Sequence, residues 1–322
     1  MPLVAVTMGD PSGIGPEIVL KTLIRNPELR EQVIAVGSSR ALKNAAESMH
    51  LEKIPDDIKI RNVDGQISPM GKSGPESGNI AVRSIEAASA MALNSEVMGI
   101  CTAPISKESI KMAGSPFIDH TDMLKELTGS EWNSTVFESG TLRIFFLTKH
   151  LSLMKALKSL NTEMIEQGLE EARISMNLIG IESPRIAVAA INPHAGENGI
   201  LGLEEKNIIM PAILKMKKRL NVNGPFPADS VYYRASRGEF DLVVSPYHDQ
   251  GHIAAKMLDF HGTVSMNLGL PYLRTSVDHG TAFDIAGRGI ANEESMTAAI
   301  KKCLQLSEIY RKNYSRIFGG IS

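Results

Sequence analysis

Short apolar segments that end in polar loops and lead into helices limit what this chain can fold into. Leu242–Val244 is predicted to be a buried strand, and the chain turns at Pro246 into a predicted helix that carries Tyr247–Lys256. Val97–Cys101 and Arg185–Ile191 are predicted strands of the same kind, each followed by polar residues. Strands that alternate with helices indicate an α/β fold. Because ligands in α/β folds bind at the carboxyl ends of strands, the loops that follow the strands are the candidate sites.

The composition excludes several classes of function. The chain has 322 residues, enough for one large or two ordinary α/β domains, and a net charge of −2. It has no basic run, so no nucleic acid and no anionic membrane is expected as a partner. Met1–Val6 enters a strand pattern directly, and no apolar run approaches the roughly 18 residues of a membrane span, so we expect a cytoplasmic protein. Cys101 and Cys303 are too few for a disulfide framework and are expected to be structural thiols.

A glycine-rich loop, Met8–Glu17, follows the first predicted strand, Leu3–Thr7. A loop of this kind before a helix can present backbone N–H groups to an anion or a nucleotide. Gly13-Ile14-Gly15 lacks the third glycine of a dinucleotide fingerprint, and the glycines before Lys72 are too far apart for an ATP-binding loop. Two interpretations therefore stay open for Met8–Glu17, an anion cradle and a tight turn without a ligand.

A second polar loop carries Asp119-His120-Thr121-Asp122, with Thr121 or Asp122 as the predicted cap of a helix over residues 123–128. His120 and Thr121 either contact a ligand together or belong to a simple capping loop. From about Gly129 the pattern changes to a β-hairpin, which predicts the start of a second lobe. We expect residues 1–128 and 267–322 to form the first α/β lobe and residues 129–266 the second.

Three histidines follow predicted strands in an equivalent way: His150, His194 and His248. Neutral imidazole is the commonest protein ligand of a divalent metal, and three imidazoles leave positions open for a substrate oxygen. The three residues are too far apart in the chain for a local motif, so a metal site is inferred from their placement alone. Scattered capping or core histidines are the alternative.

The segment Asp278–Asn292 resembles the loop with which isocitrate and isopropylmalate dehydrogenases hold the adenosine half of their nicotinamide cofactor, His-Gly-Ser/Thr-Ala-x-Asp-Ile-Ala-Gly-x-Gly-x-Ala-Asn. Glycines let the backbone approach a nucleotide, while His, Asp and Asn side chains offer hydrogen-bonding groups. The resemblance implies that NAD, with NADP as an alternative, binds to residues of this loop: His279, Gly280, Thr281, Asp284 and Asn292.

Several further motifs narrow the resemblance to one family. They are Met8–Glu17, His120-Thr121, Asn192–Glu197, Phe226–Asp229, Tyr247–Gly251 and Arg274–Ala282. From about residue 3 to residue 300, the chain resembles the 4-hydroxythreonine-4-phosphate dehydrogenase family. This resemblance implies an isocitrate dehydrogenase-like fold of two α/β lobes with a cleft between them. It also implies one divalent metal, zinc, magnesium, manganese or cobalt, and a homodimer whose active site takes residues from both subunits.

The resemblance gives individual residues a role. His150, His194 and His248 fall on the metal ligands of the family. The substrate-binding positions fall on His120, Thr121, Lys256 and Arg274, and Asp229 matches an acid near the reacting hydroxyl. The proton acceptor is His120, Asp229 or Lys256. The family's Asn-Ile-Thr-Leu-Gly-Leu-Pro segment reads Ser265-Met266-Asn267-Leu268-Gly269-Leu270-Pro271 here, so Ser265 occupies the place of a substrate-binding asparagine.

The resemblance implies a NAD- and metal-dependent dehydrogenase that oxidises the 3-hydroxyl of a phosphorylated acid, followed by decarboxylation. The substrate is either 4-phosphohydroxy-L-threonine, of pyridoxine biosynthesis, or 4-phospho-D-threonate or 4-phospho-D-erythronate, of carbohydrate metabolism. Tyr247–Lys256, with His252 after the glycine, is more similar to the sugar-acid branch. The alternatives are a dihydrodiol carboxylate dehydrogenase of the same family, and a three-histidine hydrolase or aldolase, which would not need the adenosine loop.

Overall fold

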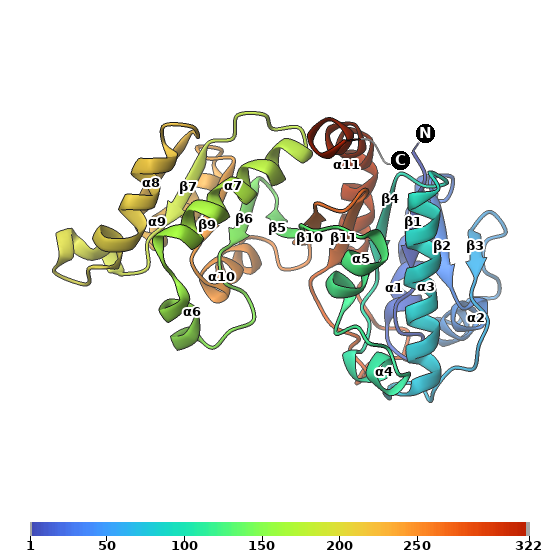
Figure 1. Ribbon diagram of the computed structural model, residues 1–322. Coiled ribbons are helices and arrows are strands. Elements are labelled where there is room, and N and C mark those ends of the chain that lie inside the picture. The colour runs from blue at the N-terminus through green and yellow to red at the C-terminus, as the bar shows by residue number, and fades with distance from the viewer. Residues whose placement is uncertain (1, 320–322) are drawn as a thin grey trace. The chain divides into compact units, whose positions relative to one another are not determined.

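The structure is a computed structural model that describes residues 2–319. The chain divides into two compact units, which we describe separately. Unit 1 comprises the chain up to Asn133 together with the part from Val264 onward, and unit 2 is Ser134–Thr263. Each unit combines strands with helices, so the predicted α/β class is confirmed (Figure 1).

Unit 1 contains six strands in the order β3-β2-β1-β4-β11-β10. Their bounds are β1 Val4–Thr7, β2 Val33–Gly37, β3 Lys59–Asn62, β4 Gly99–Thr102, β10 Val264–Leu268 and β11 Leu273–Val277. The strands are parallel except that β10 runs antiparallel to β11. Every residue of β1, β4, β10 and β11 is buried, which explains why β1 and β4 are mainly apolar. Strands β10 and β11 are buried as well but carry several polar side chains, and these are candidates for a functional role.

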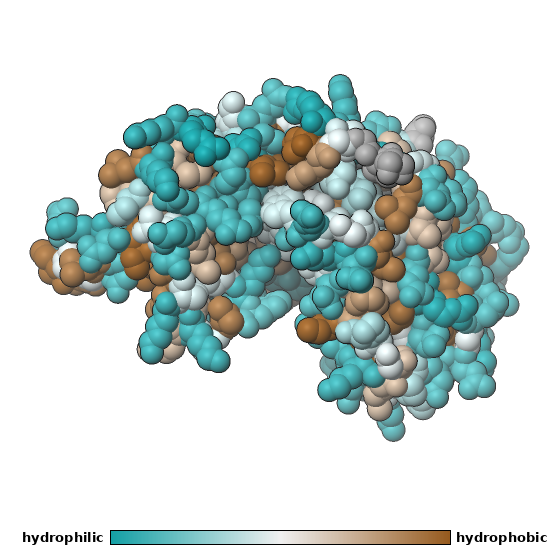
Figure 2. All heavy atoms as spheres, viewed as in Figure 1, coloured by the Kyte–Doolittle hydropathy of each residue, from teal (hydrophilic) through white to brown (hydrophobic). Residues whose placement is uncertain are grey.

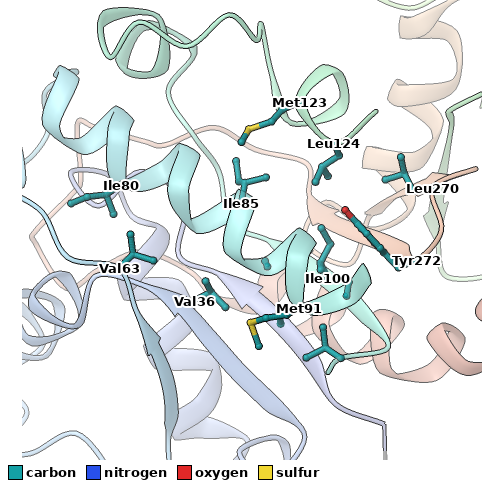
Figure 3. Packing of buried hydrophobic residues seen from close by; sticks show 14 residues of the cluster. Val36, Val63, Ile80, Ile85, Met91, Ile100, Met123, Leu124, Leu270 and Tyr272 are labelled. Carbon is teal, nitrogen blue, oxygen red and sulfur yellow. The ribbon is translucent and has the colours of Figure 1, made fainter. Parts of the chain in front are cut away.

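The helices of unit 1 are α1 Gly15–Arg25, α2 Ser39–Ser48, α3 Pro75–Leu93, α4 Lys107–Met112, α5 His120–Thr128 and α11 Glu294–Phe318, with a short 3₁₀ helix at Pro27–Leu29. The alanine-rich α3 packs on β1 and β2, and α11 packs on β11 and β4. Figure 3 shows Ile80 of α3 beside Val63, and Ile85 of α3 lies in the same core as Val36 and Ile100. Each such buried aliphatic side chain stabilises the fold by about 1.5–3 kcal/mol.

Unit 2 contains five strands in the order β5-β6-β9-β7-β8. Their bounds are β5 Ser134–Ser139, β6 Leu142–Phe146, β7 Ile186–Ala189, β8 Val222–Phe226 and β9 Leu242–Ser245. The predicted hairpin is present, because β5 and β6 are antiparallel and turn at Gly140, whose φ is +58°. The other neighbours, β6 with β9, β9 with β7 and β7 with β8, are parallel.

The helices of unit 2 lie between these strands in the chain. They are α6 Leu153–Ser159, α7 Thr162–Leu178, η2 Pro193–Gly199, η3 Glu205–Ile209, α8 Met210–Met216, α9 Ala228–Ser236 and α10 His248–Leu258. Apolar side chains of β6, β7, β9, α9 and α10 form one core. Strand β9 ends at Ser245 and α10 begins at His248, so the predicted order of a strand, a short turn and a helix is present.

Across residues 2–319, no helix has the length and apolar character needed to cross a membrane. Figure 2 shows hydrophilic residues over most of the face in view, with hydrophobic residues in small separate areas. Cys101 and Cys303 are both buried free thiols, and burial raises the pKa of Cys101 to about 12. A buried thiol with a high pKa is unreactive, as predicted for structural cysteines.

Candidate active site

Arg274 places a positive charge in the interior of unit 1. Its guanidinium donates hydrogen bonds to Thr102 Oγ1 from Nε (3.1 Å) and Nη2 (2.7 Å), and from Nη1 to Asn267 Oδ1. The residue is 6% exposed, and burial lowers the pKa of Arg274 to about 10. It takes part in none of the ion pairs found within residues 2–319, and Asp119 attracts it only at longer range. A buried cation whose hydrogen-bond partners are neutral is costly, so the site is suited to an anion.

His120 adds a second buried polar group. It is the first residue of α5, and the cap is Asp119, whose Oδ1 accepts hydrogen bonds from the backbone N–H groups of Thr121 (2.9 Å) and Asp122 (3.1 Å). The prediction of Thr121 or Asp122 as the cap is therefore wrong, because the helix begins three residues earlier than predicted. A cap at Asp119 fixes His120 in helical geometry, facing inward at 8% exposure.

The environment of His120 keeps its imidazole neutral. Burial, followed by the nearby charges of Arg274 and Lys107, lowers the pKa of His120 well below its ordinary value. Within residues 2–319, its Nε2 atom is buried and has no hydrogen-bond partner. Buried polar atoms are almost always satisfied, so an unpartnered Nε2 beside a buried guanidinium indicates a place for a ligand.

Thr121 and Asn267 complete this set of side chains. Asn267 Nδ2 donates to Thr121 Oγ1 (3.5 Å) and to Asn133 Oδ1 (3.3 Å). Three predicted substrate residues, His120, Thr121 and Arg274, thus lie in one group. We call this group, with the two further residues that bind Arg274, the Arg274 cluster: Thr102, His120, Thr121, Asn267 and Arg274. Sequence reasoning gave no role to Thr102 or Asn267, although a polar side chain in an otherwise apolar strand was the available signal.

The predicted cofactor loop lies in unit 1 and is held by α1. Lys21 Nζ donates to the carbonyl oxygens of Gly289 (2.9 Å) and Ala291 (2.7 Å). Glu17, which is 3% exposed, accepts from Ala291 N (2.7 Å) and from Lys21 Nζ (2.8 Å) through the same oxygen, Oε1. An ion pair one helical turn apart on α1 therefore fixes the backbone of the loop at residues 289–291.

The glycine-rich loop after β1 is used for packing. The amide of Asp10 donates to the carbonyl of Pro104, that of Ser12 to the Asp10 carboxylate, and that of Gly13 to the carbonyl of Asp10. Ile14 N donates to Thr281 O (3.0 Å), which ties this loop to the predicted cofactor loop. A Cβ on Gly9 would lie 2.1 Å from the Pro104 carbonyl oxygen. These amides already have partners, so the structure favours the tight turn over the anion cradle.

The five predicted cofactor residues are accessible to a ligand to different degrees. His279 and Thr281 are half-buried, while Gly280, Asp284 and Asn292 are exposed. The Asn292 side chain also accepts a hydrogen bond from Glu294 N (2.7 Å) at the start of α11. The structure therefore places all five in one loop on a buried support, and their binding of a cofactor stays a prediction.

In unit 2, α10 presents a line of polar residues at four-residue intervals, His248, His252 and Lys256. The rings of His248 and His252 stack with centroids 4.0 Å apart, and His252 stacks on Phe146 at 4.9 Å with nearly parallel planes. The His150 ring lies 5.9 Å from that of His248. The structure thus brings two of the three predicted metal ligands together, with His252 fixing the ring of one of them.

A cavity of about 210 Å³ lies at this place in unit 2, and His150, Tyr247, His248, Asp249 and Lys149 line it together with apolar residues. His248 Nδ1 lies 2.7 Å from Asp249 Oδ1, a contact that orients the imidazole. Lys149 is half-buried, and burial lowers its pKa. Sequence reasoning missed Lys149, because its position beside His150 gave no sign that its side chain would turn toward the cavity.

His194 occupies a different setting in unit 2. It begins a run of five residues with left-handed backbone, His194–Asn198, in which only Gly196 is a glycine. Glu205, 4% exposed, holds the start of this turn, because its Oε1 accepts from Ile191 N (2.8 Å) and Asn192 N (2.7 Å). Among residues 2–319, no three His, Cys, Asp or Glu side chains form a group that could hold a metal ion. His194 is therefore not joined to His150 and His248 in one set of ligands.

The remaining predicted site residues are Asp229, Lys256 and Ser265. Asp229 is exposed in the first turn of α9. Lys256 is half-buried, with Nζ 4.8 Å from the centre of the Phe260 ring. Ser265, 7% exposed, lies on β10 two residues before Asn267, on the same face of the strand. Within residues 134–263, Asp229 is not held by a set of side-chain hydrogen bonds like the one in the Arg274 cluster.

These observations define an α/β protein with a buried guanidinium among neutral polar side chains in one unit and a histidine-lined cavity in the other. The family model described as "Pyridoxal phosphate biosynthetic protein PdxA" matches residues 20–303. The chain belongs to this family. A D-threonate 4-phosphate dehydrogenase of Pectobacterium atrosepticum is 40% identical over 95% of this chain and 99% of the relative.

Solved structures agree with this assignment. A 4-hydroxythreonine-4-phosphate dehydrogenase from Klebsiella pneumoniae is 38% identical, with a TM-score of 0.85 over 95% of this chain and 100% of that one. A terephthalate 1,2-cis-dihydrodiol dehydrogenase from Burkholderia xenovorans is 26% identical, with a TM-score of 0.61 over 97% and 98% of the two chains. The family resemblance is confirmed, as is the predicted enzyme class, a dehydrogenase that acts on a CH–OH group.

Proposed function

We propose that this protein oxidises a four-carbon sugar-acid phosphate, 4-phospho-D-threonate or 4-phospho-D-erythronate, with NAD and releases CO₂. The observation that carries the proposal is the buried charge of Arg274, which has only neutral hydrogen-bond partners within residues 2–319. The planar fork of a guanidinium suits a phosphate or a carboxylate, and the proposed substrates carry both. The relative from Pectobacterium, named for D-threonate 4-phosphate, supports the same substrate class.

The charge around the Arg274 cluster favours a sugar acid over 4-phosphohydroxy-L-threonine. The amino acid carries an ammonium at C2, where the sugar acids carry a hydroxyl. An ammonium near the guanidinium would be disfavoured, because two like unit charges 4 Å apart repel by about 4 kcal/mol at an effective dielectric constant of 20. The nearby carboxylate, Asp119, is already paired with Lys107 at 3.3 Å. A neutral hydroxyl meets no such repulsion.

The proposed chemistry assigns steps to the chain's own residues. Arg274 and Thr121 hold the anionic substrate, and the neutral His120 offers Nε2 to a substrate hydroxyl. NAD bound at His279–Asn292 would supply the acceptor for the hydride that leaves C3. The 3-hydroxyl proton goes to Lys256 or Asp229, because the lowered pKa of His120 makes it a poor base. The bond between C2 and the carboxylate of the resulting β-keto acid then breaks, CO₂ leaves, and the enolate that remains takes up a proton at C2.

The proposal includes a divalent metal, zinc, magnesium, manganese or cobalt, on His150, His194 and His248. The ring centroids of His150 and His248 lie 5.9 Å apart, and both residues line one cavity, which supports a metal at this place. His194 does not join them within residues 2–319, so none of the steps above is assigned to a metal. A metal bound there would lower the pKa of the 3-hydroxyl.

We also propose the isocitrate dehydrogenase-like fold and a homodimer whose active site is shared between subunits. The division into two α/β units supports the fold. Exposed apolar side chains in unit 2, among them Ile200 (80% exposed) and Leu214 (61%), support a protein partner. Light scattering should give twice the mass of one chain, and a monomer that is fully active would contradict the shared site.

The test of the proposed function is NADH formation at 340 nm with 4-phospho-D-threonate, 4-phospho-D-erythronate and 4-phosphohydroxy-L-threonine, each with every candidate metal and with EDTA. We expect a higher kcat/KM with at least one sugar acid than with the amino acid. Turnover of 4-phosphohydroxy-L-threonine alone would contradict the proposal. Turnover of a ring dihydrodiol carboxylate alone would move the protein to the other branch of its family.

A further inference from the structure

Lys149 brings a positive charge to the histidine-lined cavity of unit 2. It follows the end of β6 by three residues, directly before His150, and it is half-buried in the lining of the cavity. Within residues 2–319, its Nζ atom makes no ion pair and no hydrogen bond, and Glu171 attracts it only at longer range. A half-buried ammonium without a partner is costly, and an anionic ligand would supply the missing partner.

The negative charge in the same cavity does not supply this partner. Among the described residues that line the cavity, Asp249 is the only carboxylate. Its Oδ1 atom lies 2.7 Å from His248 Nδ1, and its side chain is 78% exposed, so water and the imidazole already stabilise its charge. The cavity therefore offers Lys149 to a bound molecule as a positive group that no side chain has neutralised.

The lining of the cavity favours a carboxylate over a phosphate. A phosphate monoester carries a charge of about −1.5 to −2 at neutral pH, whereas a carboxylate carries a single charge that one lysine can match. The apolar part of the lining consists of Leu151, Leu153 and Ala156. Apolar surroundings disfavour a carboxylate relative to neutral CO₂, the product of the proposed reaction. The volume of about 210 Å³ is far more than one water molecule needs, so a carboxylate fits.

We propose that Lys149 binds the carboxylate that the substrate loses as CO₂, while the planar fork of Arg274 serves the phosphate. This inference rests on the proposed function and assigns one cation of the chain to each anionic group of the substrate. The Lys149 ammonium donates a hydrogen bond to a carboxylate oxygen and holds the C1 group against the apolar lining. When the bond between C1 and C2 breaks, its electron pair stays with the carbon skeleton as the enolate. The CO₂ leaves uncharged, and the ammonium no longer holds it.

The test measures dissociation constants by calorimetry, without NAD, for 4-phospho-D-threonate and for D-threitol 4-phosphate, in which a CH₂OH group replaces the carboxylate. In Lys149→Met we expect the affinity for 4-phospho-D-threonate to fall about tenfold or more, the effect of one charge-assisted hydrogen bond, and the affinity for D-threitol 4-phosphate to change less than about twofold. Lys149→Gln should show the same pattern, and Lys149→Arg should keep most of the preference for the carboxylate. Lys155→Met removes an exposed lysine of α6 that does not line the cavity, so this matched control should change neither constant.

Equal losses for both compounds in Lys149→Met would overturn the inference, as would equal affinities of the wild type for the two. A loss that follows the phosphate, with the affinity for D-threonate unchanged, would overturn it as well. A wild type that oxidises 4-phospho-D-threonate, beside a Lys149→Met variant that keeps its preference for the carboxylate, would overturn the inference alone. A wild type that recognises the carboxylate through Lys149 but oxidises neither sugar acid would contradict the proposed function and leave the inference standing.

Discussion

Replacing Arg274 with methionine should weaken substrate binding strongly while changing the stability of the protein little. A pKa of Arg274 lowered to about 10 corresponds to about 3 kcal/mol by which the buried charge opposes folding. Methionine removes this cost. It also removes three hydrogen bonds, two to Thr102 and one to Asn267, each worth about 1 kcal/mol. The two contributions are similar in size and opposite in sign, so we expect the free energy of unfolding in urea to change by less than about 2 kcal/mol.

Arg274→Met should weaken substrate binding without any compensating gain. A buried fork that is already oriented donates two charge-assisted hydrogen bonds to an anion, and their loss should cost about 3 kcal/mol, or about 150-fold in the dissociation constant of 4-phospho-D-threonate. Arg274→Lys, which keeps the charge without the fork, should fall between the wild type and Arg274→Met. Isothermal calorimetry measures the binding. Loss of more than about 4 kcal/mol of stability with unchanged binding would refute the reasoning and make Arg274 a structural residue.

Three further predictions follow from other residues. The pKa of His120 is lowered in the folded state, so protonation of the unfolded state reduces the free energy of unfolding as the pH falls below 6.5. Between pH 7.5 and 5.5 the wild type should therefore lose about 1.4 kcal/mol more unfolding free energy than His120→Gln. Equal losses would contradict this. Lys21→Met should raise the dissociation constant of NAD about tenfold without affecting that of 4-phospho-D-threonate, because it frees the carbonyls of the cofactor loop; equal effects on both would indicate general unfolding. His194→Ala and His248→Ala should each lose the bound metal by elemental analysis with the fold intact, and full metal content in His194→Ala would exclude it as a ligand.

Part of the candidate site and the boundary between the two units could be predicted from the sequence. The resemblance to a known family predicted His120, Thr121 and Arg274 as substrate-binding residues, and the structure places them in one group. The division near residues 133 and 263 lies close to the change of pattern seen around Gly129. This change of pattern is readable because hydrophobic periodicity and turn residues act over short distances in the chain.

Residues whose role depends on a distant neighbour could not be found in the same way. Asn267 matters because β10 pairs with β11 in one register, which sets it opposite Arg274, and no local pattern encodes that register. Glu205 has its role because a buried carboxylate meets the amides of Ile191 and Asn192. The cap of α5 was misplaced because Asp119, Thr121 and Asp122 are all good capping residues, and only the backbone geometry chooses among them.

The measurement that tests the central claim most directly is the stoichiometry of the reaction with 4-phospho-D-threonate. NADH is followed at 340 nm, and CO₂ is collected from substrate labelled at its carboxyl carbon. We predict one NADH and one CO₂ for each substrate consumed in the wild type, with both products falling together by about 150-fold in kcat/KM for Arg274→Met. Consumption of the sugar acid without reduction of NAD, or no consumption under conditions in which 4-phosphohydroxy-L-threonine is oxidised, would contradict the claim.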